Sequence, residues 1–140
     1  MLDPKIDAKI QTSFGKQSLM ATLGARLVKI NAGAVEIEAA ITPRTLQQQG
    51  FAHAGLTFAL GDSAAGYSAL SLMALDQEVL TTEMKIHLLA PGAGEKLIAR
   101  GRVIKPGRRL VIVQSDVFAV QDGKERHIAL LTGTMMPVTI

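Results

Sequence analysis

Hydrophobic and polar positions alternate with a period of two over most of the C-terminal half of the chain. In the stretch 79–89, "VLTTEMKIHLL", alternate positions predict the two faces of a strand. One face carries Leu80, Thr82, Met84, Ile86 and Leu88, and the other carries Thr81, Glu83, Lys85 and His87. The pattern continues through 96–105, 110–120 and 127–138, between the turn sequences "PGAGE", "PGRR" and "QDGKER". Four strands joined by short hairpins are typical of an antiparallel sheet.

The N-terminal half predicts a short helix and two more strands. Apolar residues recur at spacings of four after Pro4, which predicts an amphipathic helix over 3–14. The stretch 23–41 predicts two strands around Asn31-Ala32-Gly33, because apolar and glutamate positions alternate after this turn. Residues 43–53, which include three consecutive glutamines, predict a loop.

The tract 54–75 consists mainly of small residues and contains one charged side chain, Asp62. It predicts a long helix, and a helix without a polar stripe must be covered on most sides. A membrane span is disfavoured, since an aspartate in mid-span costs about 2.5–3.5 kcal/mol. We therefore expect an α+β fold in which an antiparallel sheet of about six strands wraps around one long central helix, with a short helix at the N-terminus.

Composition narrows the class of protein. A chain of 140 residues with 48% hydrophobic and 19% charged residues predicts one folded domain over 1–140. With 4% aromatic residues and a net charge of +3, nucleic-acid binding is not expected. The absence of cysteine excludes disulfides and thiolate chemistry, and the N-terminus resembles no signal peptide, so we expect a cytoplasmic protein.

Two residues raise a chemical question. Burying the Asp62 carboxylate is costly, so Asp62 is either structural, accepting bonds from nearby hydroxyls, or functional. His53, just before the tract, is either a cap or loop histidine or part of a site. Three dispersed histidines make no metal-binding pattern, so neither a metal nor another cofactor is expected.

The order of elements resembles the hotdog fold, and within it the acyl-CoA thioesterases of the phenylacetate-degradation branch. The resemblance covers almost the entire chain. It rests on "GFAHAG" at the expected helix start and on "DSAAGY", which begins nine positions after His53. It is extended by "TTEMKIHLLAPG", "GRRL" and "DGKERHIALLTGT".

The resemblance implies hydrolysis of a CoA thioester, in which Asp62 acts on water as a general base or attacks the carbonyl as a nucleophile. It implies that the backbone N–H after the histidine, here that of Ala54 where the family usually has glycine, polarises the thioester oxygen. Gln47 stands where the family often has asparagine, with Gln48 as a competing candidate. Thr81 matches a serine or threonine that often assists.

Helix geometry adds an expectation about assembly. Ala54 and Gly55 lie at the expected helix start, where free N–H groups and the positive end of the helix dipole can stabilise an oxyanion. Asp62 lies roughly 13 Å further along the axis, too far to meet the same carbonyl. We therefore expect a homodimer, or a tetramer of two dimers, in which Asp62 of one chain faces His53, Ala54 and Gly55 of another.

Other interpretations remain open from the residues. Ser63 beside an acid suggests a serine nucleophile with His53 as its base, but a nucleophile elbow needs a strand-to-helix turn. A non-catalytic acyl-CoA binding module on the same fold is the rival from another class. The acyl group is left open, and candidate lining residues are Phe51, Phe58, Tyr67 and Met73. Basic residues at two turns are either solvated or bind CoA phosphates: Lys105, Arg108, Arg109, Lys124 and Arg126.

Overall fold

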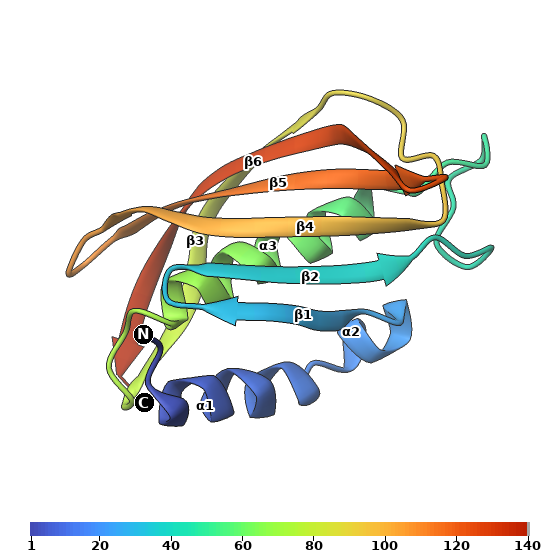
Figure 1. Cartoon of the computed structure of the whole chain (residues 1–140). Helices are drawn as coiled ribbons and strands as arrows, with labels where there is room; N and C mark the ends of the chain where they lie inside the picture. Colours follow the sequence, from blue (N-terminus) through green and yellow to red (C-terminus); the bar gives the residue numbers. More distant parts are fainter. Residues whose placement is uncertain (140) are drawn as a thin grey trace.

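The computed structural model describes residues 1–139, which form three helices and six strands (Figure 1). In chain order these are α1 (Pro4–Gly15), α2 (Ser18–Leu23), β1 (Arg26–Asn31), β2 (Ala34–Ala40), α3 (Ala54–Leu70), β3 (Gln77–Leu88), β4 (Lys96–Pro106), β5 (Val111–Gln121) and β6 (Lys124–Thr139).

The six strands form one sheet in the order β1-β2-β4-β5-β6-β3, with every neighbouring pair antiparallel. The long helix α3 runs along one face of this sheet and contacts five of its strands (Figure 1). Helices α1 and α2 lie beyond the β1 edge, and β3 forms the opposite edge. The expected α+β architecture, with a sheet wrapped around one central helix, is confirmed.

The first helix forms where the sequence predicts it, with an N-terminal cap that the sequence analysis did not identify. The Asp3 side chain caps it by accepting a hydrogen bond of 2.8 Å from the Lys5 N–H, and Pro4 occupies the first helical position. Ile6 and Ile10 are buried against the core. The short helix α2 was not predicted, because its six residues are too few to show a helical period.

Small residues let α3 approach the centre of the sheet closely. A Cβ added to Gly101 of β4 would lie 2.4 Å from the carbonyl carbon and oxygen of Ala64. Ala64 and Ala65 are fully buried at this contact. On the next strand, the Ser115 hydroxyl donates a 2.6 Å hydrogen bond to the Gly61 carbonyl oxygen. Only residues without bulky side chains can occupy this contact.

Two buried serines connect the C-terminal end of α3 to β2 and to the turn before it. The Ser68 hydroxyl donates to the Ala64 carbonyl oxygen (2.7 Å) and accepts the Val35 N–H (3.0 Å). The Ser71 hydroxyl likewise donates to the Ser68 carbonyl oxygen (2.6 Å) and accepts the Gly33 N–H (2.7 Å). Each hydroxyl therefore has both a donor and an acceptor partner, which removes the cost of burying it.

Two boundaries differ from the expected ones. The helical part of the tract 54–75 ends at Leu70, and the following residues form a turn into β3. The turn in "QDGKER" comprises only Asp122 and Gly123, both with positive φ (53° and 75°), so β5 and β6 extend further than expected.

Within residues 1–139, no helix is both long enough and apolar enough to cross a membrane.

Strand β3 contains a β-bulge at Thr82, between the pairs that Thr81 and Glu83 make with β6. A bulge adds one residue to one strand, so the inward and outward alternation shifts by one position. Leu80 is therefore 51% exposed, and the prediction that it shares a face with Met84 is wrong. The same shift turns Thr81 toward α3.

The Gly101 contact leads to a prediction about stability. Gly101→Ala places a methyl group against helix backbone that cannot rotate away, so we expect a loss of about 1–3 kcal/mol in the free energy of unfolding. Gly15→Ala is the matched control, because no atom lies within 4 Å of its added Cβ. Urea unfolding of both variants measures the difference. Equal stability of the two variants would contradict the close approach.

Candidate active site

The site begins where the loop after β2 enters α3. His53 is the N-cap residue of α3, with φ −63° and ψ 141°, and its Nδ1 accepts a 2.8 Å hydrogen bond from the Gly55 N–H. An accepting Nδ1 requires the neutral ring with its proton on Nε2. His53 thus caps the helix, one of the two roles considered for it.

The two amides proposed as oxyanion donors are not equivalent. The Gly55 N–H is donated to His53, whereas the Ala54 N–H forms no hydrogen bond within residues 1–139. The next amide along the helix, that of Leu56, donates to the His53 carbonyl oxygen at 3.0 Å. Ala54 therefore presents a free donor at the positive end of the helix dipole.

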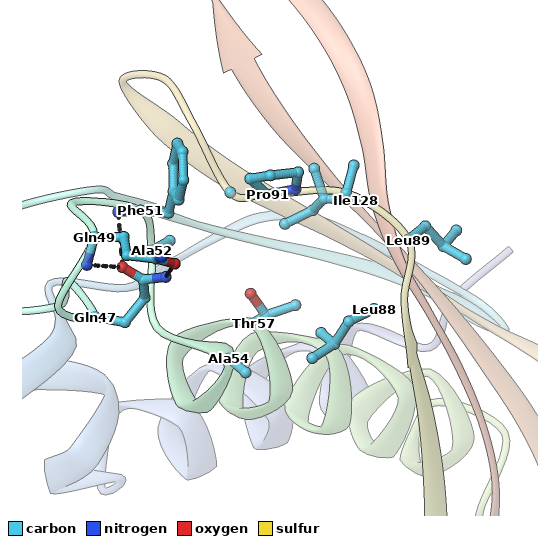
Figure 2. Close-up of a pocket in the computed structure, with 12 residues that line it drawn as sticks. Gln47, Gln49, Phe51, Ala52, Ala54, Thr57, Leu88, Leu89, Pro91 and Ile128 are labelled. Atoms are coloured by element: carbon cyan, nitrogen blue, oxygen red, sulfur yellow. Dashed lines mark hydrogen bonds between the residues drawn. The ribbon is translucent and has the colours of Figure 1, made fainter.

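A pocket of about 410 Å³ opens over this helix start (Figure 2). Ala54 and Thr57 lie on its helix side, and the Gln47–Phe51 loop and the segment after β3 complete it. The Gln47 side-chain oxygen accepts the backbone N–H groups of Gln49 and Phe51 (3.3 Å), which folds the loop. Gln48 is exposed and does not line the pocket.

Asp62 lies near the middle of α3 and is half-buried. Its carboxylate accepts a 2.8 Å hydrogen bond from the Thr81 hydroxyl of β3. Burial raises the pKa of the Asp62 carboxyl above the ordinary value of 3.8, and the bond from Thr81 opposes part of this rise. The bulge at Thr82 makes this contact possible, because it turns Thr81 toward the helix.

A second pocket, of about 240 Å³, surrounds Asp62. Ser63 and Tyr67 line its helix side, and Thr81 lies on its β3 side. Ser13 of helix α1 and Gln17, the N-cap residue of α2, also line it, and the sequence interpretation missed both. Phe14, next to Ser13, lies with its ring 6.2 Å from that of Tyr67, a contact that no pattern along the chain indicates.

The two pockets share no lining residue. Ala54 and Asp62 are eight positions apart on one straight helix, which separates them by about 12 Å along the axis. One chain therefore carries a donor half and a carboxylate half that cannot contact the same small group. The separation expected from the sequence is present.

The candidate acyl-pocket residues are also divided. Phe51 lines the pocket at the helix start and Tyr67 lines the pocket at Asp62. Phe58 is 37% exposed, and Met73 lies in a different surface pocket. The basic residues of the two turns lie at opposite ends of β5, so they do not form one cluster (Figure 1).

The other candidate chemistries find little support. Ser63 lies well inside α3, without the strand-to-helix turn of a nucleophile elbow. His127 pairs with Asp116 at 3.0 Å on the sheet surface, and His87 is exposed on β3. Within residues 1–139, no group of three His, Cys, Asp or Glu side chains is arranged to hold a metal ion.

Comparison with known proteins defines the class. The family model of the thioesterase superfamily matches residues 49–125, more than half of the chain. A thioesterase family protein from Silicibacter pomeroyi is 41% identical and superposes with a TM-score of 0.94, over 96% of this chain and 99% of that one.

Two more distant structures share the fold. The PaaI protein from the phenylacetic acid degradation operon of E. coli is 21% identical, with a TM-score of 0.86 over 99% of this chain and 96% of that one. A thioesterase from Haemophilus influenzae is 19% identical, with a TM-score of 0.83 over 92% of this chain and 88% of that one. The expected hotdog fold is confirmed. The chain belongs to the thioesterase superfamily, whose members support thioester hydrolysis as its general chemistry.

The raised pKa of Asp62 predicts a pH-dependent effect on stability. Since the folded state holds the Asp62 proton more tightly than the unfolded state, the ionised carboxylate destabilises the fold above the raised pKa. Asp62→Asn should therefore be more stable than the wild type at pH 7. Its advantage should shrink as the pH falls through the raised pKa toward 3.8.

Denaturant titrations at pH 7 and near pH 4 measure this advantage. Thr81→Val provides a companion variant: it removes the hydrogen bond to the carboxylate, so it should destabilise the wild-type protein more at pH 7 than in acid. A lower stability of Asp62→Asn at pH 7 would show that the carboxylate is a structural group.

Proposed function

We propose that this protein hydrolyses acyl-CoA thioesters to a free acid and CoA, at a site shared between two chains. The observation that carries the proposal is the division of α3 into two halves. A free Ala54 amide stands at its positive end, and a half-buried Asp62 with a raised pKa lies about 12 Å along it. Membership of the thioesterase superfamily supports the reaction type.

Asp62 would act first, in one of two ways. As a general base, it takes a proton from water while the water oxygen adds to the thioester carbonyl carbon; the tetrahedral intermediate then expels the CoA sulfur, which receives that proton. As a nucleophile, it adds to the carbonyl and expels CoA, and water hydrolyses the resulting anhydride. Burial favours both roles, because a raised pKa makes the carboxylate a stronger base.

The oxyanion that forms on the carbonyl would be stabilised by the Ala54 N–H. The Gly55 N–H is already engaged, so His53 and Gly55 would serve to fix the first turn of α3. Gln47 would hold the loop over the thioester through its bonds to Gln49 and Phe51. Gln48 would reach the substrate only from the exposed side of this loop.

Strand β3 supports the proposed dimer. It spans 12 residues, and its outer edge pairs with no other strand within residues 1–139. Leu80 and Leu88 are exposed on it. A long, unpaired edge readily pairs with another chain. Antiparallel pairing of two β3 strands would set two α3 helices side by side in opposite directions, which moves each Asp62 toward the other chain's Ala54.

Turnover tests the role of Asp62. Asp62→Asn keeps the bond from Thr81 but removes basicity and nucleophilicity, so CoA release should fall by about 10²–10⁴-fold. Ser63→Ala is the matched control on the same helix, and it should lower the rate only severalfold. In a serine hydrolase, Ser63→Ala would instead lower the rate by on the order of 10⁶-fold, and a fluorophosphonate would label Ser63.

For the wild type, kcat/KM should fall in acid with a midpoint above pH 3.8, because protonation of the Asp62 carboxylate removes the base.

The same assay separates enzyme from binding module. Wild-type protein that binds acyl-CoA in a calorimeter without releasing CoA from any ester in a broad panel would contradict hydrolysis. Such a result would favour the non-catalytic acyl-CoA binding module.

Ala54→Pro tests the oxyanion donor. Proline is favoured at the first helical position, and the extended His53 backbone (ψ 141°) suits a residue before proline. The change therefore removes one N–H and leaves the helix intact. We expect kcat to fall by about 10²–10³-fold with little change in stability. Ala59→Gly, further along the same helix, controls for small changes in helix stability.

Mixing the two inactive variants tests the shared site. In a mixed dimer of Ala54→Pro and Asp62→Asn chains, one of the two sites combines the intact halves. Random pairing should restore about a quarter of the wild-type rate, since half of the dimers are mixed. Size-exclusion chromatography should show a dimer or tetramer throughout. A mixture that refolds together but stays inactive would contradict the shared site, as would an active monomer.

A further inference from the structure

The far end of the Asp62 pocket holds a hydrogen-bond network around Tyr67. The Tyr67 hydroxyl accepts a 2.8 Å bond from the Gln17 side-chain amide and lies 3.0 Å from the Ser13 hydroxyl. Tyr67 is 5% exposed, and Phe14 packs against its ring. The network therefore joins α1 to α3 at a fixed position beside the pocket.

This network retains hydrogen-bonding capacity on the pocket side. Within residues 1–139, the side-chain oxygen of Gln17 accepts no hydrogen bond, and the Ser13 hydroxyl bonds only to Tyr67. Both side chains line the pocket together with Asp62. A bound group that carries a hydroxyl or carbonyl could use these free positions, whereas a methyl group would displace water from them without replacing its hydrogen bonds.

The pocket geometry favours the acyl group as the occupant. It runs along the α3 face from Asp62 to Tyr67 and Leu70, and the latter two are buried. A pocket of this size that ends against buried side chains on α3 suits a short acyl group better than the long pantetheine arm and nucleotide of CoA. The larger pocket at the helix start, of about 410 Å³, is the better route for CoA.

The dimensions limit the acyl group. At about 30 Å³ per water-sized group, the 240 Å³ pocket holds about eight such groups. Asp62 and Tyr67 are five residues apart, or about 7.5 Å along the helix axis. An extended chain advances roughly 1.2 Å per bond, so a polar group about six bonds from the carbonyl carbon would reach the network.

We propose that Ser13, Gln17 and Tyr67 select short acyl groups that carry a hydrogen-bonding group at their far end. This specificity rests on the proposed thioesterase function, because it assumes that the carbonyl is held near Asp62. The three residues are specificity-determining rather than catalytic.

Two thioesters of equal length test the selection. 6-Hydroxyhexanoyl-CoA and heptanoyl-CoA differ only in a terminal hydroxyl or methyl group. We expect the wild type to prefer the hydroxylated ester by about tenfold or more in kcat/KM, since an apolar end offers no hydrogen bond to the partly buried Gln17 oxygen and Ser13 hydroxyl. Tyr67→Phe removes the centre of the network, and Gln17→Leu removes its free oxygen. Each should bring the ratio close to one while CoA release from heptanoyl-CoA continues.

Gln11→Leu is the matched control, because it makes the same change on α1 outside the Asp62 pocket and should keep the wild-type ratio. A wild-type ratio near one, or an unchanged ratio in both Tyr67→Phe and Gln17→Leu, would overturn the selection and leave hydrolysis intact. Binding of both esters to Asp62→Asn by calorimetry provides a second readout. Preferential binding without any hydrolysis by the wild type would refute the enzyme but support the selection.

Discussion

The close contact between α3 and the centre of the sheet is the constraint on which the rest of this structure depends. Gly101 of β4 meets the backbone of Ala64 without an intervening side chain. At this distance the sheet must curve around the helix, since bulky residues would push the two apart. The hydroxyls of Ser68 and Ser115 form hydrogen bonds between α3 and the sheet at this contact, to the Val35 N–H and the Gly61 carbonyl oxygen.

This rigid helix also determines how the candidate chemistry is arranged. Its first turn presents the free Ala54 amide, and its middle carries Asp62, so the helical rise sets the distance between them. Neither group can move independently of the core. The helix therefore fixes the distance between Ala54 and Asp62. The shared site that we propose requires a second chain to bring the two groups together. The exposed edge of β3 lies beside this helix and suits that pairing.

Most of the fold could be predicted because its signals are local. Period-two alternation indicated the strands, and the uniformly small tract indicated a covered helix. Helix α2 was missed, since six residues hold no repeating pattern. The bulge at Thr82 was also missed, because a bulge depends on how two strands pair. The alternating pattern of β3 continues across the bulge in the sequence, but the two faces of the strand exchange there. The side-chain directions of Leu80 and Thr81 were reversed for that reason.

The sequence alone determined the order of elements, the covered helix and the candidate pair of His53 and Asp62, because helix periodicity and a lone charge in an apolar tract are visible along one chain. Only the tertiary structure decided what these residues contact. It assigned the Gly55 amide to His53 and turned Thr81 toward Asp62. It also brought Ser13 of α1 and Gln17, just before α2, beside Tyr67. Such contacts join segments far apart in the chain, so they follow from packing geometry and are absent from any local pattern.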